Sequence, residues 1–378
     1  MRKNYLLTPG PTPLPPEVLE AMARPIIHHR TPQFQAVLKE ASEGLKYVFE
    51  TLNDVFILAA SGTGTMEAAV INLLSPGDTA LTIQGGKFGE RWTELCQAYG
   101  ITPEIIDVEW GKAVEPLQIQ KRLKANPKIK AVFTTLCETS TGVATNLEAI
   151  GKVIKDTNAV LVVDAISGLG AIDLKTDAWF CDVVVSGSQK GLMLPPGLGF
   201  ISLSQKAWKL VENSKCPKYY FDLKEAKKAL DKTDTPFTPA ITLIIALCEA
   251  LKMIKEDGLE KVFSRHRKMA DATRTAVKAL GLELFAPTAA SDVVTAVKVP
   301  AGIDGEKLVK TMRDTYGITI AGGQSELKGK VFRIAHMGYI EEFDIIACIS
   351  CLEKVLTQMG YKFNLGAGVK AAEEVFLK

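Results

Sequence analysis

The chain has 378 residues, of which 47% are hydrophobic and 23% charged, a composition typical of soluble globular proteins and long enough for two or more domains. Its net charge of +2 indicates neither a nucleic-acid partner nor an anionic membrane surface, and no apolar run approaches the ~20 residues that span a bilayer. The N-terminus lacks the apolar core of a signal peptide, so we expect a cytoplasmic protein whose seven cysteines are free thiols.

Two patterns bear on a metal or redox site. His28 and His29 are adjacent and have no carboxylate neighbours, which makes a poor metal site. Cys348 and Cys351 form a CxxC motif, but they fall within an apolar helical pattern with no second such motif nearby, which favours core packing. We therefore predict no metal site.

The first 65 residues predict an arm followed by a strand and a turn. Residues 1–16 contain five prolines and predict an extended N-terminal arm, either a loose terminus or a segment packed on the fold. Helical patterns follow from Glu17 and over 33–52, and residues 55–58 predict a buried strand. The small-residue turn at 61–65 then leads into a helix with an apolar stripe, formed by Met66, Ala69, Val70, Leu73 and Leu74. This turn either binds a phosphate with its backbone N–H groups or is a plain helix cap.

The next strand, at 79–84, ends in two glycines, a lysine, Phe88 and another glycine, before a helix over 90–100. Phe88 is too exposed at a strand end to be a core residue unless a flat group covers it. A planar ring stacked on Phe88 is the predicted partner.

A strand at 130–136 runs into the sequence CETSTG, whose hydroxyl groups either contact a ligand or cap the helix expected at 146–156. The strand after that helix ends in Asp164. A carboxylate at the end of a buried strand is costly without a partner, so we predict that Asp164 has a functional one.

Lys190 lies at the centre of the most informative stretch, CDVVVSGSQKGLMLPPGLGFIS. A buried strand at 183–185 leads through a small polar corner to Lys190, and the glycines and prolines that follow exclude a helix. Lysines mostly occupy solvated faces, so a lysine on a stiff loop at a strand end indicates chemistry. The alternative is a surface turn with an incidental lysine.

The alternation of strands with 10–15-residue helices predicts an α/β fold with a mostly parallel sheet over residues 17–255. Every candidate site residue so far follows the carboxyl end of a strand, where open α/β sheets bind ligands. Polar helical sequence at 204–234 and a long apolar helix to about Ile254 complete this domain.

Residues 256–378 predict a smaller C-terminal α+β domain, with strands at 293–299, 318–321 and 331–337 between helices. Arg333 lies in the last of these strands. A buried arginine needs a planar anionic partner, which is either the carboxylate of an amino acid or a structural salt bridge.

Together these pieces resemble the class-V aminotransferases, close to the alanine–glyoxylate and serine–pyruvate enzymes. The matching motifs extend over nearly the whole chain: TPGPTPLP, SGTGTMEAA, GKFGERW, ETSTG, VVDAISGLG, SGSQKGLMLPPGLG, TPFTP and VFRIAHMG. The resemblance implies PLP-dependent transferase fold type I, with pyridoxal 5'-phosphate as cofactor.

The resemblance also implies roles for individual residues. Lys190 binds the cofactor covalently and acts as base, and Asp164 keeps the pyridine nitrogen protonated. Arg333 holds the substrate carboxylate, with Gly10 of the arm nearby. A hydroxyl at Thr139, or Ser140 if the register differs, bonds the phenolic oxygen. The remaining cofactor-binding residues are Thr63, Gly64 and Thr65 at the phosphate, Phe88 on the ring and Gln189 before the lysine. Thr235, with Thr238 as the alternative, is contributed by the partner subunit of a homodimer.

The implied reaction is transfer of an amino group from a small L-amino acid, alanine or serine, to a 2-oxo acid such as glyoxylate or pyruvate. Aspartate is the alternative donor, because a cation elsewhere could bind its second carboxylate. A class-V desulfurase or lyase is disfavoured, since those enzymes place histidines where this chain has Gln189 and Phe88. A non-enzymatic role would not need Lys190, Asp164 and Arg333 together.

Overall fold

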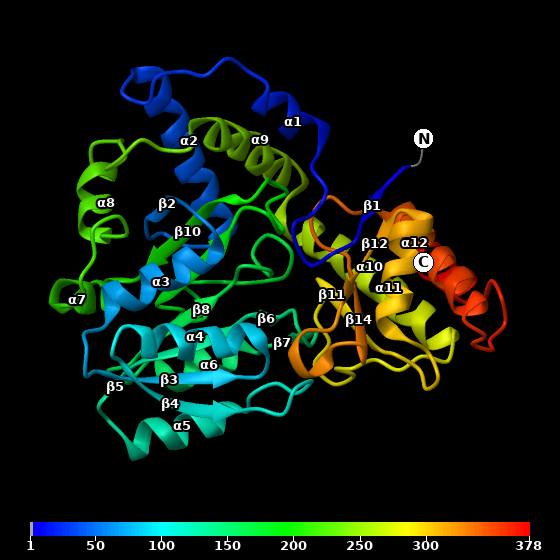
Figure 1. Ribbon diagram of the computed structural model, residues 1–378. Coiled ribbons are helices and arrows are strands. Elements are labelled where there is room, and N and C mark those ends of the chain that lie inside the picture. Colours follow the sequence, from blue (N-terminus) through cyan, green and yellow to red (C-terminus); the bar gives the residue numbers. More distant parts are fainter. Residues whose placement is uncertain (1–2) are drawn as a thin grey trace.

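The computed structural model describes residues 3–378, which form a large domain and a smaller C-terminal domain beside it (Figure 1). The large domain contains a seven-stranded sheet in which only β10 runs antiparallel to its neighbours, so the predicted mostly parallel sheet is confirmed. In spatial order the strands are β2 (Val55–Ala60), β10 (Gly197–Leu203), β9 (Val183–Gly187), β8 (Val160–Asp164), β5 (Ile129–Thr135), β3 (Thr79–Gln84) and β4 (Thr102–Asp107).

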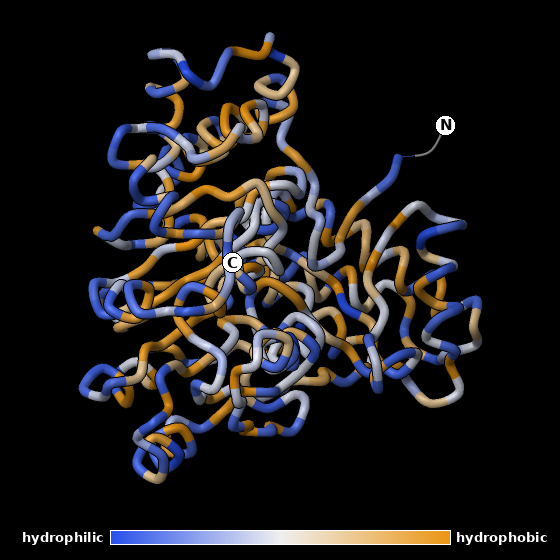
Figure 2. Tube along the Cα trace, turned by 60° about the vertical axis from the view of Figure 1, so that its left-hand side comes forward, coloured by the Kyte–Doolittle hydropathy of each residue, from blue (hydrophilic) through white to orange (hydrophobic). Residues whose placement is uncertain are grey.

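Helices cover both faces of this sheet, because its strands are apolar on both sides. Leu161 and Val163 of β8 face one core, whereas Val160 and Val162 face the other. The apolar residues lie along the inner strands in Figure 2. The first core contains α1 (Pro16–Met22), α2 (Pro32–Phe49), α5 (Pro116–Ala125), α6 (Leu147–Ile154) and α9 (Ile241–Asp257), and the second contains α3 (Gly62–Leu73), α4 (Lys87–Ala98), α7 (Gln205–Asn213) and α8 (Leu223–Leu230).

The C-terminal domain has a core of its own and an antiparallel sheet, as the α+β prediction requires. The sheet order is β11 (Val294–Lys298), β14 (Val331–Ala335) and β13 (Ala321–Gly322). Its helices are α10 (Leu259–Ala279), α11 (Gly305–Tyr316), the 3-10 turn η1 (Ser325–Leu327), α12 (Glu342–Gln358) and α13 (Ala367–Phe376). Cys348 and Cys351 are buried in α12, so core packing of the CxxC motif is confirmed.

Helix α10 connects the two domains. Val262 in its first turns belongs to the core of the large domain, and Val277 near its end belongs to the core of the small one. The boundary between residues 255 and 256 falls just before this shared helix and stays a prediction.

The N-terminal arm is packed on the fold. Strand β1 (Tyr5–Leu6) pairs in parallel with β12 (Ile318–Thr319) of the small domain. The carbonyl of Leu7 then accepts a hydrogen bond from Ala335 N at 2.9 Å, at the end of β14. The arm therefore crosses from the small domain to the loop that follows β9 of the large sheet before α1 begins.

Three boundaries differ from the sequence predictions. Helix α2 ends at Phe49 because Glu50 takes a left-handed conformation, with φ of 48°. Helix α4 begins already at Lys87, so Phe88 lies in its first turn and not at a strand end. The segment 204–234 forms two helices interrupted around Pro217, a residue that cannot donate a backbone hydrogen bond. Over residues 3–378, no helix has the length and apolar character needed to cross a bilayer.

Candidate active site

Lys190 follows β9 on a loop whose position is fixed by hydrogen bonds within the loop and to the N-terminal arm. The carbonyl of Lys190 accepts hydrogen bonds from Met193 N at 3.0 Å and from the Thr12 hydroxyl at 3.1 Å. Its Nζ donates to the carbonyl of Pro9 in the arm. Burial lowers the pKa of Lys190 from 10.5 to about 8, so its neutral, nucleophilic form is accessible near neutral pH.

Gly10 lies directly against this lysine. Its φ is +104°, a conformation that favours glycine, and a Cβ atom there would overlap the end of the Lys190 side chain. The structure thus brings together two predicted site residues that are 180 positions apart in the chain.

Asp164 is the last residue of β8 and is only 5% exposed. Its Oδ1 accepts a hydrogen bond from Ile166 N at 2.8 Å, while Oδ2 has no hydrogen-bond partner within residues 3–378. Burial raises the pKa of this carboxyl to about 7. The free oxygen can accept a hydrogen bond from a cationic N–H group, which would restore the charged form.

The start of α3 offers free donors, as the phosphate interpretation requires. The N-cap Ser61 makes no side-chain capping bond, and the first backbone N–H groups of a helix have no intrahelical partner. Thr63 is exposed, and Gly64 has no room for a side chain, since a Cβ would lie 2.9 Å from that of Ala60. These features favour an anion site over a plain cap.

Thr65 does not share this exposed position. Its hydroxyl is fully buried and lies 2.6 Å from the carbonyl of Gly62 and 3.3 Å from that of Ser186. Because Thr65 faces the sheet, the side chain secures the turn of α3 to β9 instead of facing the open side of the helix end.

Phe88 is half-buried in the first turn of α4, next to Arg91, a residue that the sequence reasoning missed. The Arg91 guanidinium lies 5.0 Å from the centre of the Phe88 ring and donates to the Thr63 hydroxyl at 3.3 Å. The ring-stacking candidate and the phosphate candidate are therefore connected through one side chain. The signal was the i, i+3 spacing of Phe88 and Arg91 on a helix.

Glu138 is a second residue that the sequence reasoning missed. Its buried carboxylate accepts hydrogen bonds from Phe88 N at 3.0 Å and Gly89 N at 2.9 Å, capping α4, and from the Ser140 hydroxyl at 2.5 Å. Burial raises the pKa of Glu138. A glutamate directly after a buried strand was the available signal.

The Ser140 hydroxyl donates a hydrogen bond to Glu138 and accepts one from Lys87 N. Within the described residues, the Thr139 hydroxyl has no hydrogen bond. This difference favours Thr139 over Ser140 as the residue that contacts a ligand. The capping alternative is wrong, because Asn146 caps α6 by accepting from Ala149 N at 3.0 Å.

Arg333 is 4% exposed and reaches into the same region from the small domain. Its guanidinium donates to the carbonyls of Gly322, at 2.7 and 3.0 Å, and of Thr139, at 2.8 Å. No carboxylate in the described chain forms an ion pair with it, so the salt-bridge alternative is not observed. Burial lowers the pKa of Arg333 to about 10, and this cation is available for an anionic ligand.

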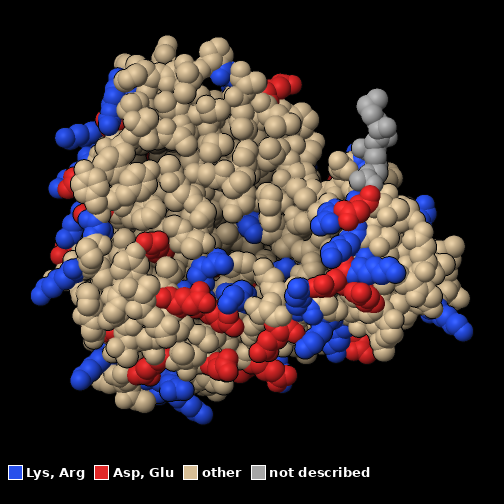
Figure 3. All heavy atoms as spheres, viewed as in Figure 1, with Lys and Arg blue, Asp and Glu red and all other residues tan. Residues whose placement is uncertain are grey.

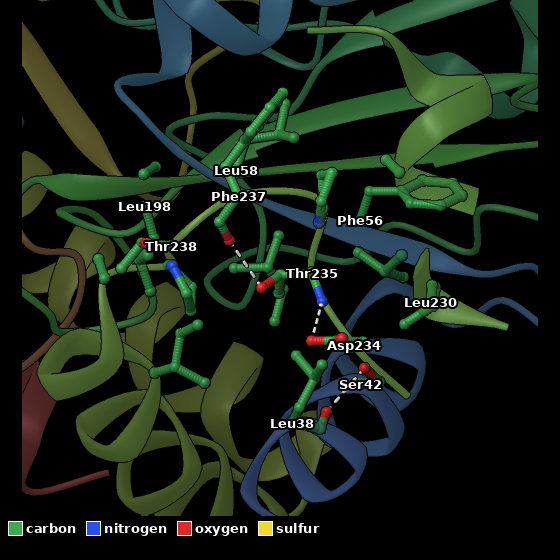
Figure 4. Close-up of a pocket in the computed structure, with 18 of the residues that line it drawn as sticks. Leu38, Ser42, Phe56, Leu58, Leu198, Leu230, Asp234, Thr235, Phe237 and Thr238 are labelled. Atoms are coloured by element: carbon green, nitrogen blue, oxygen red, sulfur yellow. Dashed lines mark hydrogen bonds between the residues drawn. The ribbon is translucent and has the colours of Figure 1, made fainter. Parts of the chain in front are cut away.

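Gln189 and Thr235 complete the predicted set. The Oε1 of Gln189 is buried without a hydrogen-bond partner, which indicates that a donor is missing beside it. Thr235 lies elsewhere, in an apolar pocket between α2 and β2 with Leu38, Phe56 and Leu58, where its hydroxyl donates to the carbonyl of Phe237 at 2.8 Å (Figure 4).

The site thus contains four groups that the predicted cofactor and an amino-acid substrate would require. The neutral form of Lys190 suits an aldehyde, and the free oxygen of Asp164 suits a pyridine nitrogen. The N-terminus of α3 suits a phosphate, and Arg333 suits a carboxylate. Within residues 3–378, no group of three or more His, Cys, Asp or Glu side chains is arranged to hold a metal ion.

Comparisons with known proteins identify the family. The sequence model of Aminotransferase class-V matches residues 4–337. The soluble hydrogenase 42 kDa subunit of Anabaena cylindrica is 47% identical, over 99% of both chains. The serine–glyoxylate aminotransferase of Methylorubrum extorquens is 39% identical, over 98% of this chain and 95% of that protein. The L-aspartate–glyoxylate aminotransferase of Paracoccus denitrificans is 37% identical, over 98% and 96%.

Among solved structures, the ureidoglycine–glyoxylate aminotransferase of Bacillus subtilis superposes with a TM-score of 0.95 and 31% identity, covering 100% of this chain and 99% of the other. The chain therefore belongs to the class-V aminotransferase family and is a PLP-dependent transaminase.

Proposed function

We propose that this enzyme transfers the amino group of a small L-amino acid, serine or alanine, to glyoxylate. The proposal rests on the buried Arg333 guanidinium, which forms no ion pair within residues 3–378. The backbone carbonyls of Thr139 and Gly322 accept hydrogen bonds from it and fix its position. A buried cation of this shape is satisfied by a carboxylate, the one group that every amino acid and 2-oxo acid shares.

Pyridoxal phosphate, when bound, supplies an aldehyde carbon that takes up the amino group and a ring that accepts electron density from the substrate. Lys190 would hold the cofactor and would also move the proton at the substrate Cα, a task for which a pKa of about 8 is suited. The free oxygen of Asp164 would accept a hydrogen bond from the ring nitrogen, which would favour the ionised carboxylate and a protonated nitrogen. The carbonyl of Pro9 and Gly10 exclude water from Lys190 on the side of the arm.

The acceptor is proposed from the relatives and the donor from the site. Three relatives that act on different donors, serine, aspartate and ureidoglycine, share glyoxylate in their names. Three cations affect the electrostatics of Lys190 and Asp164, namely Lys190 itself, Arg91 and Arg333. We assign the first to the cofactor, the second to the contact with Thr63 and the third to the α-carboxylate. Among residues 3–378, this assignment supports a donor without a second carboxylate.

We further propose a homodimer in which Thr235 acts in the partner's site. Thr235 lies away from Lys190 within its own chain, and the loop around it exposes aromatic side chains, with Tyr219 82% and Tyr220 45% exposed. The face over α1, α2 and α9 in the upper part of Figure 3 shows few charged side chains. Both features favour a surface that another copy covers. The seven free cysteines fit the reducing cytoplasm as its location.

Single-turnover spectroscopy tests the donor. The protein is loaded with pyridoxal phosphate until the visible absorbance of lysine-bound cofactor appears, and alanine, serine, aspartate or cysteine is then added separately. We expect fast loss of this absorbance with serine or alanine, release of the matching 2-oxo acid, and recovery with glyoxylate together with formation of glycine. Faster loss with aspartate would replace the small donor, and failure to take up the cofactor would overturn the proposal.

Mixing of inactive subunits tests the shared site. Lys190→Ala and Thr235→Ala homodimers are each expected to have low activity. If Thr235 acts across the interface, a heterodimer of the two contains one site with both residues intact, so mixing after partial denaturation restores activity. No recovery, or a monomer by light scattering, would refute the shared site.

A further inference from the structure

Arg91 is a cation that the reaction, as described so far, does not use. It lies on α4, three residues after Phe88, with its guanidinium on the Phe88 ring and a hydrogen bond to the Thr63 hydroxyl. Thr63 is the exposed residue of the first turn of α3. The guanidinium thus lies beside the free backbone N–H groups at the start of that helix.

The charge of Arg91 is not neutralised by the protein. No carboxylate of residues 3–378 lies within ion-pair distance of it. Lys87, one turn earlier on the same helix, shows the contrast, since its ammonium bonds Glu90 at 2.7 Å and lies 3.5 Å from Glu94. Within the described residues, the half-buried Arg91 has one hydrogen bond, to the Thr63 hydroxyl, so most of its five N–H groups are free to bind a ligand.

The ligand expected at this place carries a matching charge. A phosphate monoester bears about −1.5 to −2 charges at neutral pH. The dipole at a helix N-terminus offsets only about half a charge. The planar fork of a guanidinium matches two phosphate oxygens, which a helix N-terminus alone does not provide.

We propose that Arg91 is a phosphate-binding residue of the cofactor site, clamping the phosphate against the N-terminus of α3 while its face packs on Phe88. The inference rests on the proposed use of pyridoxal phosphate. Arg91 thus connects Phe88, the candidate for ring stacking, with Thr63, the candidate for the phosphate. The cation also lowers the pKa of both Asp164 and Lys190, so its charge reaches the rest of the site.

The experiment compares two ligands that differ only in the phosphate. Cofactor-free wild type, Arg91→Gln and Arg91→Lys are titrated with pyridoxal phosphate and with pyridoxal, and binding is followed by protein fluorescence and visible absorbance. We expect Arg91→Gln to raise the Kd for pyridoxal phosphate about 10- to 100-fold, the scale of a lost charge-assisted hydrogen bond. The Kd for pyridoxal should change less than about threefold. Arg91→Lys keeps the charge but loses the planar fork of the guanidinium, so its Kd for pyridoxal phosphate should lie between those of the wild type and Arg91→Gln.

Inorganic phosphate gives a readout that does not involve Lys190. It should compete with pyridoxal phosphate in the wild type and about tenfold less well in Arg91→Gln, by the same loss of a charged contact. Lys87→Gln is the matched control, because it removes a paired cation from the same helix and should leave both titrations unchanged.

Two results would overturn the assignment. Equal weakening of pyridoxal and pyridoxal phosphate would mean that Arg91 only supports Phe88. Unchanged cofactor binding with a raised KM for aspartate alone would mean that Arg91 recognises a distal carboxylate. A wild-type protein that binds neither ligand would instead refute the proposed function, and a melting temperature measured for each variant separates these outcomes from misfolding.

Discussion

Replacing Asp164 by asparagine should stabilise the cofactor-free protein while it destroys the activity. Asp164 is buried at the end of β8, and its folded-state pKa is raised from 3.8 to about 7. Asparagine has the same shape, and its oxygen can still accept the hydrogen bond from Ile166 N. The substitution therefore removes the cost of a buried charge, but it also removes the attraction to Lys190 and places an amide NH2 group at the position of Oδ2.

The magnitude follows from the pKa difference. A shift from 3.8 to about 7 corresponds to roughly 4 kcal/mol of unfavourable free energy for the ionised group, at ~1.4 kcal/mol per unit. Part of this gain is lost, because the charge of Lys190 loses an attractive partner. We expect a net stabilisation of about 2 kcal/mol above pH 7, which is roughly 2–3 °C in Tm for a chain of 378 residues.

The effect has a defined pH dependence. Between about pH 4 and pH 7 the folded state holds a proton on Asp164 that the unfolded state has lost, so the stability of the wild type falls as the pH rises through this range. The asparagine side chain does not ionise, so the stability of the variant does not fall in this way as the pH rises. Differential scanning calorimetry of both cofactor-free proteins from pH 4.5 to 8.5 should show a Tm advantage that grows up to about pH 7 and is constant above it.

Asp182→Asn is the matched control, because Asp182 is also buried in the sheet but is fully partnered. Its carboxylate accepts from Leu161 N at 3.0 Å and the Ser204 hydroxyl at 2.7 Å and lies 3.5 Å from Lys206 Nζ. That variant should lose stability, by about 1–3 kcal/mol. An Asp164→Asn protein that is less stable at pH 8, or a Tm difference that does not vary with pH, would refute the reasoning.

Further predictions concern three other residues. Cofactor capture should accelerate with pH and level off above about pH 8, the pKa of Lys190, as measured by stopped-flow absorbance; a rise continuing to pH 10 would contradict this. Lys190→Ala should bind the cofactor without the visible absorbance and show no turnover, and normal turnover would remove this lysine from the mechanism. Arg333→Gln should raise KM for every amino donor about 10- to 100-fold, whereas an unchanged KM would assign Arg333 to structure. Glu138→Gln should lower the free energy of unfolding by about 1–3 kcal/mol in urea titrations, because four N–H and O–H donors lose a charged acceptor.

The sequence was most informative where function requires a residue that the local pattern disfavours. A lysine after a β-branched strand, an aspartate ending another and an arginine within a third each violate the expectation for a buried strand, and the structure brings all three to one region. The mostly parallel sheet was also predictable, because strand and helix patterns alternate regularly along the first 200 residues.

Pairings between distant segments could not be predicted in the same way. The direction in which Thr65 faces depends on where β9 lies beside α3, and its hydroxyl bonds to Ser186 only in the folded chain. Glu138 caps a helix 50 residues earlier, so no local capping pattern marks it. The position of Phe88 was misjudged because α4 begins without a polar N-cap side chain; this distant glutamate takes that role.

The parallel pairing of β1 with β12 also bears on the order in which parts of the chain can fold during synthesis. Tyr5 is among the first residues synthesised, yet its strand partner is Ile318. At translation rates of ~5–20 residues per second, the arm waits roughly 15–60 s for that partner to emerge. The large sheet ends at β10 and can assemble during this interval, whereas the carbonyl of Pro9 reaches Lys190 in its final position only after the small domain has formed. A nascent chain stalled before residue 318 is therefore expected to contain Lys190 without its contact to the carbonyl of Pro9.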